Sequence, residues 1–479
     1  MTYRFRPGVR LVPARAGEYL LSERPLRAVR LSEGLAGLLR RTEDGEIETE
    51  DPAGQRTLEA LAVRGLLERR GSPLVPEEEL PSVSVVIPVR DRAAELRRCL
   101  EGVWGVDYPR DRLEVVVVDD GSIDESSSVA REAGVDLVPS GGMGLGPGVA
   151  RNRGVAAASG EVLAFIDSDC VPSPRWLREL VPWFADLEVA AVGGLVEGLQ
   201  SARRLDRYEA AMSSLSLGAR ERSAGEGDDT FYLPSCNLLV RREAFRAAGG
   251  FRAGMHVGED VDLSWRLRDR GGKLVYCPRG AVRHEHRSRL WPFLKRRFQY
   301  GTSEGALQTF HPRRRKRLVL PPLLTAALGL AALAPLLGAW SLLAATALAL
   351  VWDAAGFHRR LSRAGLALRF PTVVAARARA LGSLAYYVAY HLVRYYGWPL
   401  LGAALAWARL GFLAALLAAL AAGVDWTVRR PRLSFPAFAV FYLAEHLSYG
   451  LGVFWGCWRQ GTFDSYRPAV HGRAPAPAG

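Results

Sequence analysis

The sequence has few cysteines, and none of them is paired at a metal-binding spacing. Its 479 residues include only five, Cys99, Cys170, Cys236, Cys277 and Cys457. An odd and scattered set argues against a disulfide scaffold and a zinc finger, and it favours a reducing compartment. The N-terminal segment also lacks the apolar h-region of a signal peptide, so we expect the N-terminal part of the chain to lie in the cytoplasm.

Acidic residues are the scarcer of the two charged kinds. The chain has 63 lysines and arginines against 50 aspartates and glutamates, a net charge of +13. Such an excess suits nucleic acid, anionic lipid or acidic ligands. No basic-aromatic array supports a nucleic-acid partner, so we expect none. The basic run RRRKR at 313–317 directly precedes a long apolar segment, which favours a membrane.

The composition predicts four parts, residues 1–75, 82–310, 318–460 and 461–479, the last a disordered tail. In the first part, short strands precede one helix with Ser32 as its N-cap and a second helix over 56–70. This pattern resembles the small winged-helix domains of the PqqD type, which bind the leader peptides of ribosomally made, modified peptides. The alternative is a small structural cap on the next domain.

The third part contains a charge-free run at 318–352, longer than the roughly 20 residues of one membrane crossing. A break at Ala334–Pro335 predicts a hairpin of two spans, and the arginines on both flanks place both ends on the cytoplasmic side. With the apolar segments in 382–424 and 435–457 we expect two to four crossings. The protein would then lie in the cell membrane with its catalytic domain on the cytoplasmic side; a soluble helical domain is the alternative.

The second part alternates buried strands with helices. Apolar runs at 83–89 and 162–166, and the segment LEVVVVDDGS at 113–122, are typical of buried strands in a parallel sheet, and helical patterns separate them. We therefore expect an α/β fold with a doubly wound, mostly parallel sheet. In such sheets, ligands bind beyond the carboxyl ends of the strands.

Acidic clusters follow the predicted strands. Asp167 and Asp169 end the run EVLAFIDSD, and in an extended segment residues i and i+2 point the same way. Their like charges repel unless a cation lies between them, so this is either a polar turn or a site for a hard metal ion. The ordered set VSVVIP, VVVVDDGS, ARNRG, FIDSD and GEDVDLSWRL resembles the inverting family 2 glycosyltransferases of GT-A fold over residues 82–300.

That resemblance implies a nucleotide-sugar site and a divalent cation. The donor would be contacted by seven residues: Pro88, Arg90, Asp119, Asp120, Arg151, Asp167 and Ser168. Asp167 and Asp169 match the family's D-x-D element and would hold Mg²⁺ or Mn²⁺ against the diphosphate, because hard cations prefer oxygen ligands. His284 in AVRHEHRS is a further candidate ligand of the metal.

The resemblance also implies a general base. Inversion requires a group that takes the proton of the attacking hydroxyl, and Glu259–Asp260 match the family's acidic pair. Asp260 is our candidate, Asp262 is its rival, and a favourable charge at a helix N-terminus is the structural alternative. On the acceptor side we predict Asn237, whose alternative is a polar turn or strand-start residue, and Trp265, whose alternative is packing behind the base.

The chain departs from the processive cellulose- and chitin-type members. Their Q-x-x-R-W element is replaced here by LKRRFQYGTSEG at 294–305, so the segment is no evidence for polymer export. Arg296, Arg297 and Gln299 could instead contact the diphosphate or the acceptor.

Three hypotheses follow for the function. The order of the parts resembles the glycosyltransferases of mycofactocin systems, which implies glucose transfer from UDP-glucose to a peptide-derived redox cofactor. The second hypothesis is a membrane glycosyltransferase acting on a polyprenyl lipid or an envelope glycan. The third is a non-catalytic membrane scaffold that presents a peptide, against which the intact Asp167, Asp169 and Asp260 argue.

Overall fold

A computed structural model describes residues 2–15, 17–40, 46–49, 51–70, 75–224 and 230–471. The chain divides into two compact units. One comprises residues 1–71, 317–424 and 469–479, and the other comprises 72–316 and 425–468. The apolar C-terminal region, predicted as one part, is thus shared between the units, because its last helix packs with the residues of the second part.

The N-terminal part of the first unit contains two small sheets and two helices. Its elements are β1 (Thr2–Phe5), β2 (Val9–Ala14), β3 (Gly17–Glu23), β4 (Leu26–Arg30), α1 (Glu33–Arg40), β5 (Glu46–Ile47), α2 (Pro52–Val63) and β6 (Leu67–Arg70). The sheets have the orders β5-β1-β6 and β2-β3-β4. Ser32 caps α1 through a contact from the backbone N of Leu35 to Oγ (3.4 Å). The helix predicted over 56–70 is wrong in its second half, because the chain turns at Gly65 (φ +73°) and continues as β6.

The same unit contains the long helices α11 (Pro322–Leu337), α12 (Leu342–Arg363), α13 (Phe370–Ala406) and most of α14 (Ala408–Arg429). The predicted hairpin forms, but its turn follows Leu337, where Gly338 has φ +68°, and Pro335 stays inside α11. Neither arm is a candidate span, since α11 is short and α12 ends in charged residues. One face of β2–β4 packs on α12 and α13 through Val12, Tyr19 and Ala28.

The predicted disordered tail is partly ordered. Asp464–Tyr466 form the 3-10 helix η4, and β19 (Ala469–His471) pairs in parallel with β18 (Arg317–Val319). Residues 472–479 lie outside the described part of the chain.

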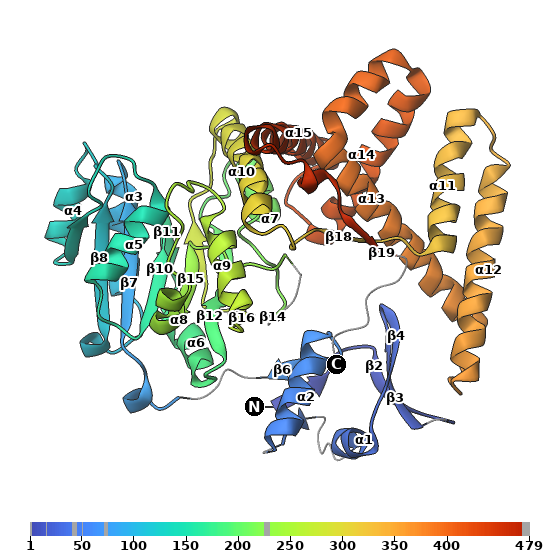
Figure 1. The fold of residues 1–479 in the computed structure, drawn as a ribbon, viewed down its shortest axis with the longest axis horizontal. Helices are drawn as coiled ribbons and strands as arrows, with labels where there is room; N and C mark the ends of the chain where they lie inside the picture. The colour runs from blue at the N-terminus through green and yellow to red at the C-terminus, as the bar shows by residue number, and fades with distance from the viewer. Residues whose placement is uncertain are drawn as a thin grey trace. The chain divides into compact units, whose positions relative to one another are not determined.

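The second unit is built on an eight-stranded sheet of order β14-β16-β12-β15-β10-β7-β8-β9 (Figure 1). Its strands are β7 (Val83–Val89), β8 (Leu113–Asp119), β9 (Asp136–Pro139), β10 (Val162–Ile166), β12 (Val189–Gly193), β14 (Arg222–Ala224), β15 (Asn237–Arg241) and β16 (Lys273–Tyr276). The predicted parallel core β10-β7-β8-β9 is present. The sheet as a whole is mixed, because β15 runs antiparallel to both of its neighbours and β14 antiparallel to β16.

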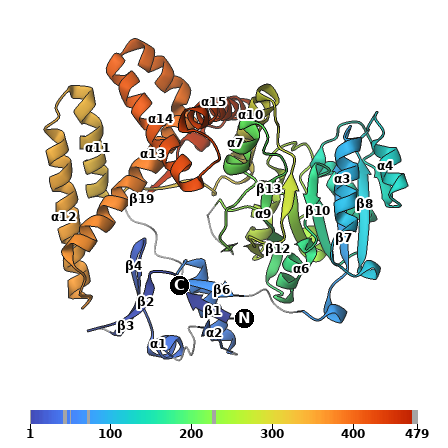
Figure 2. The same cartoon turned by 180° about the vertical axis from the view of Figure 1, so that it is seen from behind.

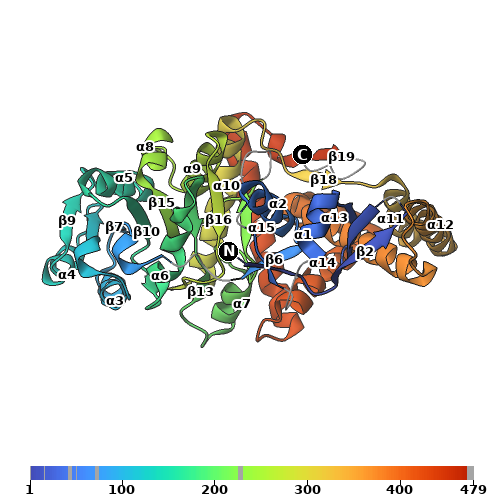
Figure 3. The same ribbon diagram turned by 90° about the horizontal axis from the view of Figure 1, so that it is seen from below.

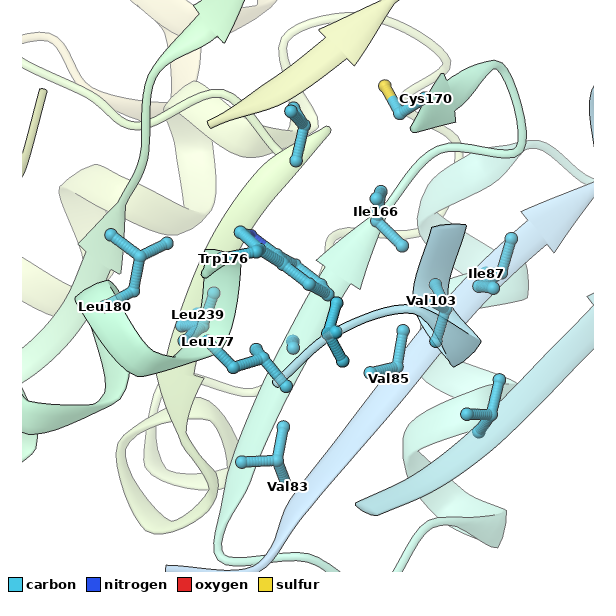
Figure 4. Close-up of a cluster of buried hydrophobic side chains, with 14 of the residues drawn as sticks. Val83, Val85, Ile87, Val103, Ile166, Cys170, Trp176, Leu177, Leu180 and Leu239 are labelled. Carbon is cyan, nitrogen blue, oxygen red and sulfur yellow. The ribbon is translucent and has the colours of Figure 1, made fainter. Parts of the chain in front are cut away.

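Helices cover both faces of this sheet, as Figure 3 shows from below. They are α3 (Ala93–Trp104), α4 (Ser126–Glu132), α5 (Pro147–Ala157), α6 (Trp176–Leu180), α8 (Arg242–Ala247) and α9 (Glu259–Asp269). Side chains of α3, α4 and α6 share one core with the sheet, and side chains of α5, α8 and α9 share the other. Figure 4 shows the first core, where Trp176 and Leu177 of α6 lie over Val85 and Leu239. The sheet is therefore doubly wound, as predicted.

A three-stranded sheet and three helices complete the unit. The order of the small sheet is β11-β17-β13, with β11 (Cys170–Pro172), β13 (Val196–Gly198) and β17 (Val282–His284). The helices are α7 (Arg204–Met212), α10 (Leu290–Phe310) and α15 (Phe435–Gln460). Short 3-10 turns η1 (Glu77–Glu79), η2 (Arg110–Arg112) and η3 (Val181–Ala185) connect other elements.

Within the part of the chain that the structure describes, two helices, α14 and α15, are long and apolar enough to cross a membrane. This number agrees with the lower end of the two to four crossings expected from the sequence. The finding associates the chain with a membrane only weakly, because buried helices of soluble proteins can have the same length and composition.

Candidate active site

The carboxyl ends of the parallel strands bring the predicted acidic residues together. Asp119 ends β8 and Asp120 follows it, and Asp167 and Asp169 follow β10, two strands away in the same sheet. The third cluster, Glu259 and Asp260, begins α9 after Gly258, which adopts φ +81°. These positions confirm that the predicted strands end at one edge, where α/β sheets bind ligands.

Arg151 joins two of these clusters. Its guanidinium, almost fully buried, contacts Asp167 at 2.5 Å and Glu259 at 2.9 Å. It also lies over the ring of Phe251, 5.3 Å from its centroid. A buried arginine needs such partners because a lone buried charge is costly. The structure thus gives Arg151, predicted to contact the nucleotide, a role in positioning the two carboxylates.

Asp260 differs from its neighbour because no cation pairs with it among the described residues. Its carboxylate accepts hydrogen bonds from the backbone N of Ser235 (3.2 Å) and of Val261 (2.8 Å). Burial, together with the adjacent charge of Glu259, raises the pKa of Asp260 to about 7. A carboxyl group with a pKa near neutrality suits proton transfer. Glu259 is committed to Arg151, so of the predicted pair Asp260 is the better base.

Asp262, the rival base, is held in a different network. It is fully buried and pairs with Arg266 (2.6 Å), Arg252 (3.2 Å) and His311 (3.0 Å). Burial alone would raise the pKa of Asp262, but these hydrogen bonds and charges lower it to about 2. A carboxylate that is so strongly held in its charged form is a poor proton acceptor, so its contacts are structural.

Asp169 and His284 form a candidate metal centre. Antiparallel pairing of β11 with β17 sets Cys170 opposite His284. His284 Nε2 then lies 3.5 Å from Asp169 Oδ1, and the potential ligand atoms of Asp169, Cys170 and His284 all lie within 4.8 Å of one another. Burial lowers the pKa of His284, while the charge of Asp169 opposes this shift. A neutral imidazole is the form that binds a metal. Carboxylate oxygen and imidazole nitrogen fit Mn²⁺, and the carboxylate alone fits Mg²⁺.

Cations surround this centre. Arg92 Nη1 donates to Asp169 Oδ2 at 2.8 Å. Burial would raise the pKa of Asp169, but the charges of His284, Arg92, Arg287 and Arg296 lower it. The sequence analysis did not predict Arg92 or Arg287 as site residues. The position of Arg92, shortly after β7 at the sheet edge where ligands were expected, could have indicated it. Several positively charged side chains near one carboxylate are a suitable environment for binding a negatively charged diphosphate.

The predicted nucleotide side is organised by loops. Asp120 is buried and accepts hydrogen bonds from the backbone N of Leu145 (3.0 Å) and Gly146 (2.9 Å). Asp119 accepts from the backbone N of Ser122 (2.8 Å) and from the hydroxyl of Ser127. Burial opposes but does not overcome these bonds, which lower the pKa of Asp119. Both carboxylates therefore shape the loops at this edge.

Pro88, Arg90 and Ser168 also lie at this edge of the sheet. Pro88 is the second-last residue of strand β7. Ser168, which lies in sequence between the two aspartates of the D-x-D element, is buried. Arg90 is half-exposed beside Asp91, whose positive φ of 51° is uncommon for a residue other than glycine. Their placement agrees with contact to a donor, which stays a prediction.

The two residues predicted to face the acceptor are engaged in packing. All polar side-chain atoms of Asn237 are used, because its amide donates to Leu195 O (2.9 Å) and Gly280 O (3.0 Å) and accepts from Trp176 Nε1 (2.8 Å). Trp265 is buried against Met255 and Leu307 and meets the ring of His311 edge-on. These contacts favour the structural alternative stated above for each residue, and contact with an acceptor stays a prediction.

Comparison with known proteins places this site in a family. The family model described as Glycosyl transferase family 2 matches residues 84–249. The Pre-mycofactocin glycosyltransferase of Mycobacterium tuberculosis is 33% identical over 468 residues, 95% of this chain and 95% of that protein.

Two further relatives cover less of the chain. Glycosyltransferase AglE of Haloferax volcanii is 31% identical over 48% of this chain and 75% of that protein. A solved structure, the mannosyltransferase PcManGT from Pyrobaculum calidifontis in complex with GDP-Man and Mn²⁺, is 24% identical with a TM-score of 0.41, over 65% of this chain and 90% of that one.

These findings confirm the family inferred from the order of the motifs. They also decide between the enzyme hypotheses and the non-catalytic scaffold, in favour of an enzyme. The second unit accordingly has the α/β architecture of a GT-A domain. The chain belongs to the family 2 glycosyltransferases.

Proposed function

We propose that the protein is an inverting, metal-dependent glycosyltransferase that moves glucose from UDP-glucose to a peptide-derived acceptor of the mycofactocin type. The donor and acceptor are proposed from the relative that matches 95% of the chain. Inversion rests on a single observation, the buried Asp260 with a pKa of about 7 and no paired cation among the described residues.

The proposed reaction is one displacement. The acceptor hydroxyl oxygen forms a bond to the anomeric carbon as the bond from that carbon to the diphosphate oxygen breaks. Asp260 takes the hydroxyl proton, and the electron pair of the broken bond leaves with the diphosphate. Arg151 holds Glu259 and Asp167 in place beside Asp260.

The diphosphate would lie beside Asp169. A divalent cation on Asp169 and His284, with Asp167 near it, would offset the negative charge of the leaving group. Arg92 and Arg287 provide fixed positive charge at the same place. Pro88, Arg90, Asp119, Asp120 and Ser168 remain our candidates for contact with the rest of the donor.

The N-terminal domain is proposed to bind the peptide portion of the acceptor, as in domains of the PqqD type. The alternative stays a structural cap on the catalytic domain; the packing that the structure describes for the β2–β4 sheet is with α12 and α13 of its own unit. We further propose that the apolar helices attach the enzyme to the cell membrane with the catalytic unit on the cytoplasmic side.

A transfer assay tests the function. The purified enzyme in detergent would be incubated with radiolabelled UDP- and GDP-sugars, a premycofactocin-type acceptor, and either Mn²⁺ or a chelator. We expect the acceptor to be labelled from UDP-glucose only with metal, and NMR of the product to show an inverted anomeric centre. Labelling only of a polyprenyl lipid supplied in parallel would overturn the acceptor, and retained configuration would overturn the role of Asp260.

A further inference from the structure

Helix α15 has a polar face that is bound to the catalytic unit. Glu445 and His446, near the middle of the helix, are both buried. Glu445 accepts a hydrogen bond from Tyr208 of α7 (2.7 Å) and pairs with Arg297 of α10 (3.5 Å). Arg297 also pairs with Glu209 of α7. The buried charge of Glu445 is therefore neutralised inside the protein.

A second face of α15 lies directly on the backbone of α10. A Cβ added at Gly301 or Gly305 of α10 would collide with the backbone of Tyr449 or Gly456, and one at Gly452 would collide with the backbone of Phe298. Such a close approach requires a glycine at each of these contact points, as in small-xxx-small helix pairs. Figure 2 shows α15 beside α10 and α7. Helix α15 is thus part of the catalytic unit.

The third face of α15 is an exposed apolar stripe. It consists of Val440, Leu451, Phe454, Trp455 and Trp458, and Ala444 and Leu447 continue it between the first two. Val440 is 66% exposed and Trp458 is 59% exposed. The spacing of three to four residues keeps these side chains on one side of the helix. An exposed apolar patch with tryptophan is typical of a surface that meets a partner or a membrane.

Arginines gather at the N-terminal end of this helix. Arg429, Arg430 and Arg432 precede α15, and Arg203, Arg204 and Arg207 begin α7. The two segments are held together by hydrogen bonds from Arg207 to Arg432 O (3.3 Å) and from Arg429 to Ala211 O (3.2 Å). Of the acidic side chains nearby, Asp206 and Asp425 are buried. The surface at the N-terminal end of α15 is therefore strongly positive.

We propose that the apolar stripe of α15 and this basic cluster dock the catalytic unit flat on an anionic bilayer, with α15 in the plane of the interface and not across it. The inference rests on the membrane attachment proposed above and specifies which surface makes it. A crossing would carry Glu445 and His446 toward the bilayer centre, along with the charged residues of α10 packed beside them. An interfacial helix with an apolar face and basic flanks binds anionic lipid without that cost.

Depth measurements on the full chain distinguish docking from crossing. Single cysteines at Val440→Cys, Leu451→Cys and Trp458→Cys would carry an environment-sensitive fluorophore, because the five native cysteines are all buried. The vesicles would contain phosphatidylcholine and phosphatidylglycerol, with quenchers at shallow or deep positions of the lipid chains. We expect all three labels at one shallow depth, about 5–10 Å into the interface. A label at Leu187→Cys, 84% exposed on the same unit, is the control and should stay in water.

Two results would overturn the proposal. A deep label at Leu451 with shallow labels at Val440 and Trp458 would show a span, and water exposure of all three would show no docking. These readings are local, so anchoring by another helix does not affect them. Transfer in detergent tests the catalytic proposal separately and needs no docking.

The basic cluster has its own test. The double variant Arg204→Glu and Arg432→Glu should weaken insertion of the Trp458 label into anionic vesicles by about tenfold or more. Vesicles of phosphatidylcholine alone should show weaker insertion for the parent chain and little further loss for the variant. Equal insertion of both chains into both kinds of vesicle would remove anionic lipid from the proposal.

Discussion

The second unit contains two buried arginines that each bridge two carboxylates, and the two clusters differ in one respect. Arg297 pairs with Glu209 and Glu445, and Tyr208 donates to Glu445, so each acid has a donor or a cation. Arg151 pairs with Asp167 and Glu259 in the same manner. Beside that pair, however, stands Asp260, a third carboxyl group without a cation of its own among the described residues.

This difference indicates a structural role for the cluster around Arg297 and a catalytic role for the cluster around Arg151. Around Arg297, paired charges join α7, α10 and α15. Burial raises the pKa of Glu209, but its direct partner Arg297 opposes that shift. Around Arg151, the cation is shared by its two partners, so Asp260 is buried next to an extra negative charge and its pKa rises to about 7. A buried ionic cluster is thus a candidate for catalysis when one member stays unpaired.

Of the variants considered, Asp260→Asn should reduce turnover the most. Without the base, turnover should fall by about 10²–10⁴-fold, while UDP-sugar binding measured by calorimetry stays within a few-fold. The matched control is Asp262→Asn on the same helix, which should lower the stability but leave turnover per folded molecule nearly unchanged. If Asp262→Asn lost turnover and Asp260→Asn kept it, the roles of the two residues would be reversed.

Arg151→Met should cost about 10²-fold in turnover, because Asp167 and Glu259 lose their common cation and shift from position. The charge of Arg151 also lowers the pKa of Asp260, so the midpoint of the pH profile should move upward in the variant. This shift is a readout that a purely structural role would not produce. An unchanged midpoint with reduced turnover would limit Arg151 to packing.

The pH profile sharpens the comparison in the parent enzyme. Asp260 accepts a proton only when it is ionised, and its pKa is about 7. Turnover should therefore fall about tenfold for each pH unit below 7 and level off above it. Initial rates between about pH 5 and 8 measure this, and a flat profile would contradict the assignment of the base.

Arg297→Met should have the smallest effect on chemistry. The free energy of unfolding should fall by about 3–5 kcal/mol, since two buried carboxylates lose their partner, while turnover of the folded fraction stays within about twofold. Urea denaturation followed by circular dichroism gives the stability. Replacing Glu209 and Glu445 by leucine in the same chain should recover much of the loss, and a variant that stays equally unstable would argue against unpaired charge as the cause.

Much of the fold could be predicted because buried strands have a local signature. The runs predicted at 83–89 and 162–166 form β7 and β10 to the residue, and the strand predicted over 113–122 forms β8, which ends earlier, at Asp119. The helical pattern predicted the second helix too long, because the backbone turns at Gly65, which has a positive φ, and the helix ends before it. The antiparallel insertion of β15 was also missed, since a continuous apolar run does not reveal the direction of its neighbours.

The acidic residues of the site could be predicted from the sequence, but the side chains that contact them could not. The carboxylates follow strands, so the topology of a parallel sheet places them at one edge. The contact of Arg151 with Glu259 joins residues 108 positions apart in the chain. No local spacing predicts such a contact. Asn237 and Trp265 had plausible positions near the base. In the structure the amide of Asn237 is fully hydrogen-bonded, and the ring of Trp265 is buried in packing.

The sequence by itself determined the class of fold, the family and the set of acidic residues, because these depend on periodicity and on motif order along the chain. Three features became known only from the packing of the chain. Asp260 is the acid without a paired cation among the described residues, His284 reaches Asp169, and α15 belongs to the catalytic unit. Each of these depends on contacts between distant segments in a medium of low dielectric constant, where one nearby charge changes the state of a neighbour. Such contacts follow from the way helices and strands pack, which the order of residues does not show.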